Sequence, residues 1–128
     1  MKQITINGKV YDIDCNAYTY VQYKSIFKEG MVKDLQKIRE YLIKQTLISN
    51  QVNQLNLNEA DKTSKIADFM RDDVDEFIVK ITQIAWIMIY TANNKIEQYD
   101  LWLKSIKDFK IDDDWIVEVA ELAANCFC

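Results

Sequence analysis

The stretch from Val74 to Asn93, VDEFIVKITQIAWIMIYTAN, constrains the fold more than any other part of this sequence. Its apolar residues recur at the i, i+3, i+4, i+7 spacing that places side chains on one face of an α-helix. This face contains Val74, Phe77, Ile78, Ile81, Ile84, Ala85, Met88 and Ala92. A helix of this length spans about 30 Å, roughly the width of a small domain. We therefore expect a central core helix around which the other elements pack.

The second half of this helix is apolar around its whole circumference. The residues responsible are Trp86, Ile87, Ile89 and Tyr90. Such a helix is buried on several sides, or it lends a face to a partner. Val79, Trp86 and Tyr90 form a second stripe opposite the core face, which either the C-terminal helices cover or a partner contacts. We extend the partner-binding hypothesis to Trp102 and Ile116, which lie on those C-terminal helices.

A membrane span is the alternative interpretation of the same stretch. A span needs about 20 mainly apolar residues, whereas the uninterrupted apolar run here is only Ile84–Tyr90. Lys80 lies just before that run, and a charge inside a span costs about 2.5–3.5 kcal/mol on insertion scales. The N-terminal sequence MKQITING also lacks the apolar region of a secretory signal. We therefore expect a core helix and no membrane partner.

Length and composition predict one helical domain over residues 1–128. A chain of 128 residues can bury one core. It has no Pro and only two Gly, which favours helices over sharp turns. The net charge of −4 comes without any dominant Lys/Arg cluster. Because nucleic-acid affinity depends largely on neutralising phosphates, we expect no nucleic-acid partner.

The residues needed for common catalytic and metal sites are largely missing. The chain has no His, the most frequent general base and metal ligand. Its two isolated Gly cannot form a phosphate-binding loop. The acidic run 112–114 lacks the alternating ligands of a calcium loop and is better interpreted as a helix cap. The three Cys are an odd number, which favours a reducing cytosol over a disulfide framework. We expect no catalytic residue, cofactor or metal.

The N-terminal residues 2–14, KQITINGKVYDID, predict a β-hairpin. Asn7-Gly8 favours a type I′ turn, because both central positions need a positive φ. This turn pairs Thr5 with Val10 and places Ile4, Ile6, Tyr11 and Ile13 on the face that meets the helices. The outer edges of an isolated hairpin can pair with another chain. We therefore place a self-association hypothesis on Thr5 and Val10.

The remaining sequence predicts helices separated by polar connections. The expected helices cover about 16–29, 31–48, 64–71, 98–107 and 115–127. Asn16 should cap the first helix and Gly30 should end it. Residues 49–63 are polar and rich in Asn and Gln, which predicts a long loop. Residues 64–71, with Ile66, Phe69 and Met70 inward, can continue directly into the central helix. Asp112 or Asp113 should cap the last helix.

The expected fold class is therefore mainly α. Five or six helices pack around the central apolar helix, and a small β-hairpin precedes them.

The order of these parts resembles a known family. A short hairpin precedes a Tyr-rich helix ending YKSIFKEGMVKDLQKI, a polar connection, the apolar helix ITQIAWIMIYTAN, the segment EQYDLWLKSI and the closing helix DDDWIVEVAELA. Over most of its length, the chain resembles the tail assembly chaperones of long-tailed bacteriophages and prophages. The segments that carry the resemblance best are Tyr23–Leu35, Ile84–Asn93 and Tyr99–Leu103.

The resemblance implies a non-enzymatic protein that keeps the phage tape-measure protein soluble until tail-tube subunits polymerise around it. It also implies self-association, possible contact with the tail-tube protein, and a location in the host bacterial cytoplasm rather than in the mature virion. Many members are also made as a longer frameshifted product. The alternative function is a small acidic helical adaptor or regulator that binds a host or phage protein.

Overall fold

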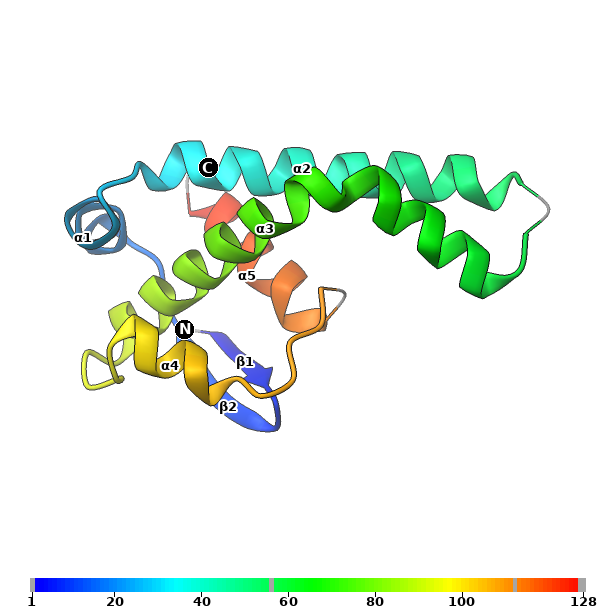
Figure 1. Ribbon diagram of the computed structural model, residues 1–128. Coiled ribbons are helices and arrows are strands. Elements are labelled where there is room, and N and C mark those ends of the chain that lie inside the picture. The colour runs from blue at the N-terminus through cyan, green and yellow to red at the C-terminus, as the bar shows by residue number, and fades with distance from the viewer. Residues whose placement is uncertain (1, 56, 112, 127–128) are drawn as a thin grey trace.

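The computed structural model describes residues 2–55, 57–111 and 113–126 (Figure 1). Residues 67, 69, 70 and 72 lie in one helix. Their backbone is described, but their side chains are not. The expected inward orientation of Phe69 and Met70, and the expected cap at Asp112, therefore lie outside the described residues.

The described part of the chain contains five helices and one two-stranded antiparallel sheet, which confirms the mainly α fold with an N-terminal hairpin. The elements are β1 (Lys2–Ile6), β2 (Lys9–Ile13), α1 (Ala17–Phe27), α2 (Met31–Asn53), α3 (Glu59–Ala92), α4 (Tyr99–Ser105) and α5 (Asp114–Asn125). Figure 1 shows α2 and α3 as the two longest helices, joined at one end of the molecule. The hairpin and the shorter helices gather around the C-terminal half of α3.

The C-terminal half of α3 forms the centre of the core, as the sequence predicts. Helix α3 packs against α1, α2, α4, α5 and β2. Ile81, Ile84, Ala85, Ile87 and Met88 are fully buried in it. Because Ile87 lies outside the predicted core face, its burial shows that α3 is covered on more than one side.

The hairpin has the predicted turn and register. Asn7 and Gly8 have φ values of 52° and 80°, as a type I′ turn requires. Thr5 pairs with Val10, and the buried isoleucines of the two strands face the helices. The Asp14 N–H donates to the Met88 carbonyl oxygen at 3.1 Å, which attaches the end of the hairpin to α3.

Helix α1 begins as predicted but ends differently. The Asn16 side chain accepts a hydrogen bond from the Tyr18 N–H at 2.9 Å, and the Thr19 hydroxyl accepts one from the Asn16 N–H at 3.0 Å. The prediction that Gly30 ends the helix is wrong. Lys28 takes the left-handed conformation, with φ 62°, and its N–H bonds the Lys24 carbonyl. Gly30 instead has extended backbone and precedes the first turn of α2.

The prediction of a long loop over residues 49–63 is also wrong. Helix α2 continues to Asn53, and α3 begins at Glu59 after an Asn58 cap that accepts from the Asp61 N–H at 2.8 Å. Asn and Gln carry only a modest helix penalty, and packing between two long helices offsets it. Val52, near the end of α2, is buried. The central helix therefore begins at Glu59, far before Val74, and ends at Ala92.

The C-terminal helices lie close to their predicted positions. Helix α4 falls within the expected range, and α5 starts at Asp114. Asp113 occupies the position before the first turn of α5, but its side chain makes no capping hydrogen bond. Asp113 is therefore at the predicted N-cap position, but the predicted hydrogen bond from its side chain to the helix is not formed.

Candidate partner-binding surface

The Trp86 part of the predicted stripe on α3 is covered. The Trp86 side chain is only 4% exposed. Its ring lies 5.9 Å from that of Phe27 at the end of α1 and 6.2 Å from that of Tyr99 at the start of α4, measured between centroids. The indole N–H donates to the Glu97 carbonyl oxygen at 3.0 Å. Of the two alternatives for this residue, cover by neighbouring elements of the same chain is the one observed.

The five predicted partner-binding residues do not form one surface. Trp102 and Ile116 are buried in the core, like Trp86, so placing these three on an exposed surface is wrong. The reason is that the C-terminal segments turn their apolar faces inward onto α3 and the hairpin. Val79 is 44% exposed, and Tyr90 is half-buried. Of these five predicted residues, only Val79 and Tyr90 are therefore open to a partner.

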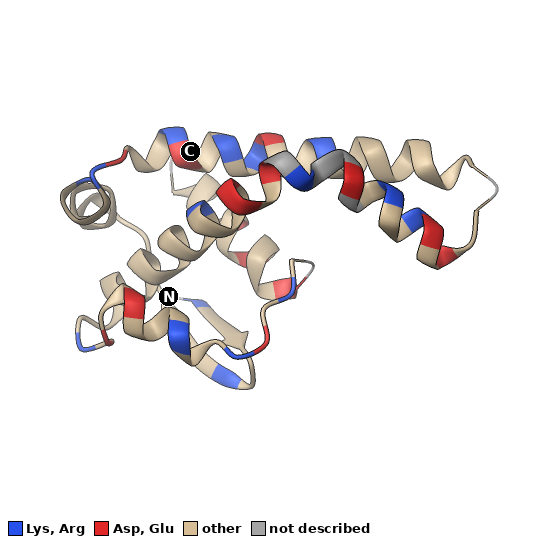
Figure 2. Cartoon of the chain, in the orientation of Figure 1, with Lys and Arg blue, Asp and Glu red and all other residues tan. Residues whose placement is uncertain are grey.

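A different apolar surface is exposed on α1. Tyr18, Val21 and Ile26 are 46%, 65% and 41% exposed. We call these three residues the α1 surface. At 100° per residue they span an arc of about 140° on the outer side of α1, and the polar residues Gln22 and Ser25 fall within the same arc. Lys24 is the one charged residue within Ala17–Phe27. Figure 2 shows α1 in the colour of uncharged residues on the side in view.

The α1 surface stands on a buried, hydrogen-bonded face of the same helix. The Tyr23 hydroxyl donates to Asp34 Oδ2 at 2.6 Å, and the Thr19 and Thr91 hydroxyls lie 2.8 Å apart. The Tyr18 ring stacks on that of Tyr90, with centroids 6.3 Å apart and planes 6° apart. The α1 surface is therefore fixed to α2 and α3, and it is continuous with Tyr90.

A buried polar cluster holds α1, α2 and α3 together. Asp34 is fully buried, and its Oδ1 lies 3.3 Å from the Lys80 Nζ. Burial and the neighbouring Asp34 carboxylate raise the pKa of Tyr23 far above its usual range. The proton therefore stays on Tyr23, where it is needed for the bond to Asp34. This pairing accounts for the presence of a carboxylate in the core.

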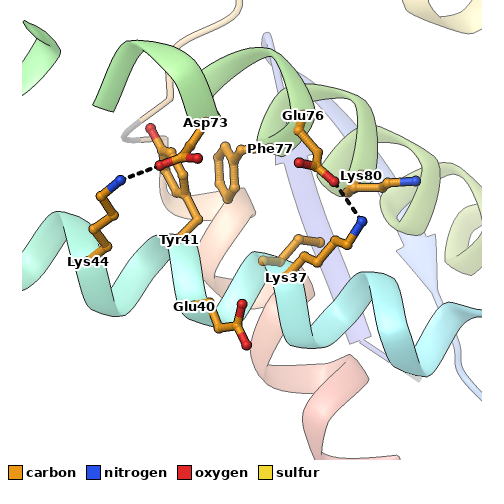
Figure 3. Close-up of a pocket in the computed structure, with 9 residues that line it drawn as sticks. Lys37, Glu40, Tyr41, Lys44, Asp73, Glu76, Phe77 and Lys80 are labelled. Carbon is orange, nitrogen blue, oxygen red and sulfur yellow. Dashed lines mark hydrogen bonds and ion pairs between the residues drawn. The ribbon is translucent and has the colours of Figure 1, made fainter. Parts of the chain in front are cut away.

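A groove of about 360 Å³ lies between α2 and α3 (Figure 3). The stacked rings of Tyr41 and Phe77 lie in it, with centroids 4.1 Å apart. Lys37 pairs with Glu76 at 2.8 Å, and Lys44 pairs with Asp73, so the two helices are linked by opposite charges. The Glu76 interaction raises the pKa of Lys37, and the Lys37 interaction lowers that of Glu76. The residues that line the groove therefore hold α2 and α3 together, and we assign the groove no ligand.

Thr5 and Val10 lie on the outer edges of the hairpin. They form the pair next to the turn-closing pair of Ile6 and Lys9. In an antiparallel ladder with a two-residue turn, the backbone groups of this next pair point away from the partner strand. Val10 and Thr5 are also exposed. The geometry therefore leaves these edges able to pair with another strand, and the self-association hypothesis stays a prediction.

The sequence pattern did not single out the α1 surface as exposed. The absence of charge from Ala17 to Val21, and again at Ser25–Phe27, is the sequence feature that could have revealed it.

Comparisons with protein-family models, with curated proteins and with solved structures found no match to this chain. None of the helices in the described ranges combines the length and apolar character needed to cross a bilayer. Within those ranges, no three His, Cys, Asp or Glu side chains are grouped to hold a metal ion. What the chain binds has to be inferred from its own surfaces.

Proposed function

We propose that this chain is a non-enzymatic chaperone that binds an apolar helical segment of a larger protein through the α1 surface. The observation that carries the proposal is the exposure of Tyr18, Val21 and Ile26 on a helix with a single charged residue. Exposed apolar side chains that gather on one side of a helix mark protein-binding sites. A row of them at helical spacing complements the apolar face of an amphipathic helix.

The client that we propose is the tape-measure protein of a long-tailed phage. The resemblance to tail assembly chaperones implies this client, which is long, apolar and rich in helices. The chain would act in the host bacterial cytoplasm and leave before the virion matures. Self-association through the hairpin edges at Thr5 and Val10, and contact with the tail-tube protein, belong to the same proposal.

The size of the α1 surface is suited to weak and reversible binding. Complete burial of a Val, Ile or similar side chain contributes about 1.5–3 kcal/mol, and these three side chains are already partly covered. Association itself costs roughly 4–15 kcal/mol. One such contact cannot give a tight complex alone. Several copies of the chain along one long client, or several contacts at once, would gain affinity through avidity.

Co-expression with tape-measure fragments tests this function. We expect the soluble yield of the fragments to fall severalfold when this chain is omitted, and to fall equally with the double variant Val21→Lys/Ile26→Lys. The matched control is Val117→Lys on α5, where the native side chain is 48% exposed but lies off the α1 surface. Fragments that stay soluble without the chain would overturn the tape-measure proposal. Full protection by the double variant would overturn the role of the α1 surface.

The alternative is a small acidic helical adaptor or regulator that binds a host or phage protein. The net charge of −4 and the same α1 surface fit this function as well. Gene order separates the two functions. A tape-measure gene immediately downstream supports the chaperone, and a regulatory gene cassette supports the adaptor.

A further inference from the structure

Two thiols from opposite ends of the chain meet beside α1. Cys15 lies between β2 and α1, and Cys126 follows the last residue of α5. Their side chains are close enough to share a hydrogen bond. The Tyr20 hydroxyl lies 3.7 Å from the Cys15 Sγ and also hydrogen-bonds Cys126. Figure 1 shows the red end of α5 near the blue segment that enters α1, in agreement with this contact.

Both thiols sit on backbone that is held in place. The Cys15 N–H donates to Asp14 Oδ1 at 2.9 Å, and Asp14 is itself bonded to α3. The Cys126 N–H donates to the Leu122 carbonyl oxygen at 3.1 Å, as a continuation of α5. Each side chain is half-buried rather than sealed in the core. The two sulfurs are therefore kept near each other and remain within reach of a small reagent.

We propose that Cys15 and Cys126 are a redox-modification site, at which a peroxide converts the two free thiols into an intramolecular disulfide. This inference is independent of the proposed chaperone function. A disulfide of this kind in a reducing compartment is transient and responds to oxidant. Reduction by a small thiol would restore the two cysteines.

The chemistry proceeds in two steps. Burial and the hydrogen bond from Cys126 raise the pKa of Cys15 to about 12, so Cys15 is a protonated thiol near neutral pH. We assign the first attack on the peroxide to the Cys126 sulfur, which loses its proton to become the nucleophilic thiolate. One peroxide oxygen becomes its sulfenic acid, and the other leaves as water. The Cys15 sulfur then attacks the sulfenic sulfur and loses its proton, and a second water leaves. Two thiols are oxidised and one peroxide is reduced.

The disulfide would enclose almost the whole chain in one covalent loop. A loop of this length removes much conformational freedom from the unfolded state. It would also fasten the end of α5 to the segment directly before α1. We expect the oxidised protein to unfold at a temperature several degrees above that of the reduced protein.

Hydrogen peroxide treatment of the full chain, followed by non-reducing peptide mapping, tests this site. The variant Cys128→Ser removes the thiol that could compete for Cys126. In this background we expect a peptide pair joined through Cys15 and Cys126, a mass loss of two hydrogens, and reversal by dithiothreitol. Adding Cys15→Ser or Cys126→Ser should remove both the linked pair and the rise in melting temperature.

Three outcomes would overturn the proposal. The first is stable sulfinic acid at Cys126 with no linked pair. The second is a disulfide only between different molecules. The third is a linked pair with an unchanged melting temperature, which would contradict the enclosed loop. The peptide map of the Cys128→Ser protein decides the first two outcomes even if a serine variant at Cys15 fails to fold.

Discussion

The Trp86 part of the second stripe of α3 and the outer face of α1 both present large apolar side chains, yet they have opposite environments. On α3, Trp86 is enclosed by Phe27 and Tyr99 and bonded to the Glu97 carbonyl. On α1, Val21 and Ile26 remain exposed. An apolar helix face therefore becomes core or contact surface according to what the rest of the chain places over it. The covered stripe should control stability, and the exposed surface should control binding.

The largest expected effect is on the covered stripe. Trp86→Ala should lower the free energy of unfolding by about 3–5 kcal/mol, because it leaves a cavity among packed rings and an unpaired Glu97 carbonyl. Urea unfolding followed by circular dichroism measures the loss. Val79→Ala, about two turns away on the same stripe but exposed, is the control and should cost far less. Equal losses for both variants would contradict the assignment of Trp86 to the core and Val79 to the exposed surface.

The next effect is on the buried polar cluster beneath the α1 surface. Tyr23→Phe removes the donor to Asp34 Oδ2 and should cost about 1–3 kcal/mol, since that buried oxygen then lacks its hydrogen bond while Lys80 still pairs with Oδ1. Tyr18→Phe, on the exposed face of the same helix, should change stability by less than about 0.5 kcal/mol. The two variants are compared in matched urea titrations, and a neutral Tyr23→Phe would contradict the supporting role of this bond.

Alkaline pH should lower the free energy of unfolding, because Cys15 and Tyr23 resist losing their protons in the folded state. The folded state raises the pKa of Cys15 from 9.0 to about 12 and raises that of Tyr23 above its ordinary 10.0. Above about pH 9 the unfolded chain therefore loses protons that the folded chain keeps, and stability falls as pH rises. Each such group contributes a slope of up to about 1.4 kcal/mol per pH unit. Urea midpoints from pH 8 to 11 measure this slope. Tyr23→Phe should flatten it above pH 10, and an unchanged slope would argue against Tyr23 as a source.

A smaller effect is expected at the hairpin edge. Thr5→Pro or Val10→Pro removes an N–H that points away from the partner strand, so the hairpin should persist while any self-association is reduced. Gel filtration with light scattering measures the oligomer size, and circular dichroism should show helicity largely unchanged. Thr5→Val keeps the N–H and serves as the control. An oligomer size that proline does not change would place self-association elsewhere.

The smallest effect on stability is expected at the α1 surface. Val21→Lys should change the free energy of unfolding by no more than about 0.5 kcal/mol, because the side chain is already mostly exposed. Thermal unfolding of the variant beside the native chain checks this expectation. A loss of several kcal/mol would show that Val21 belongs to the core, and the comparison between the two faces would then fail.

Features governed by local chemistry could be predicted from the sequence. The Asn7-Gly8 turn determines the hairpin register, and the Asn16 cap determines the start of α1, because both depend on residues close in sequence. The core face of α3 follows from its helical spacing. The polar segment after residue 48 was misjudged because long-range packing between α2 and α3 extends both helices through it.

The state of the apolar faces could not be predicted in the same way. Whether Trp86 is covered depends on Phe27 and Tyr99, which are distant in sequence and meet it only in the folded chain. The openness of the α1 surface likewise depends on where α4 and α5 pack. The meeting of Cys15 and Cys126 has the same origin, because only the fold brings the two ends together.

Site-specific photo-cross-linking tests the central claim most directly. A photoreactive phenylalanine analogue would replace Val21 on α1 or, as the matched control, Val117 on α5, during co-expression with a tape-measure fragment. Both native side chains are about half exposed or more. The proposed function predicts a cross-linked complex from position 21 and little or none from position 117. Equal cross-linking from both positions, or cross-linking only from position 117, would contradict the assignment of client binding to the α1 surface.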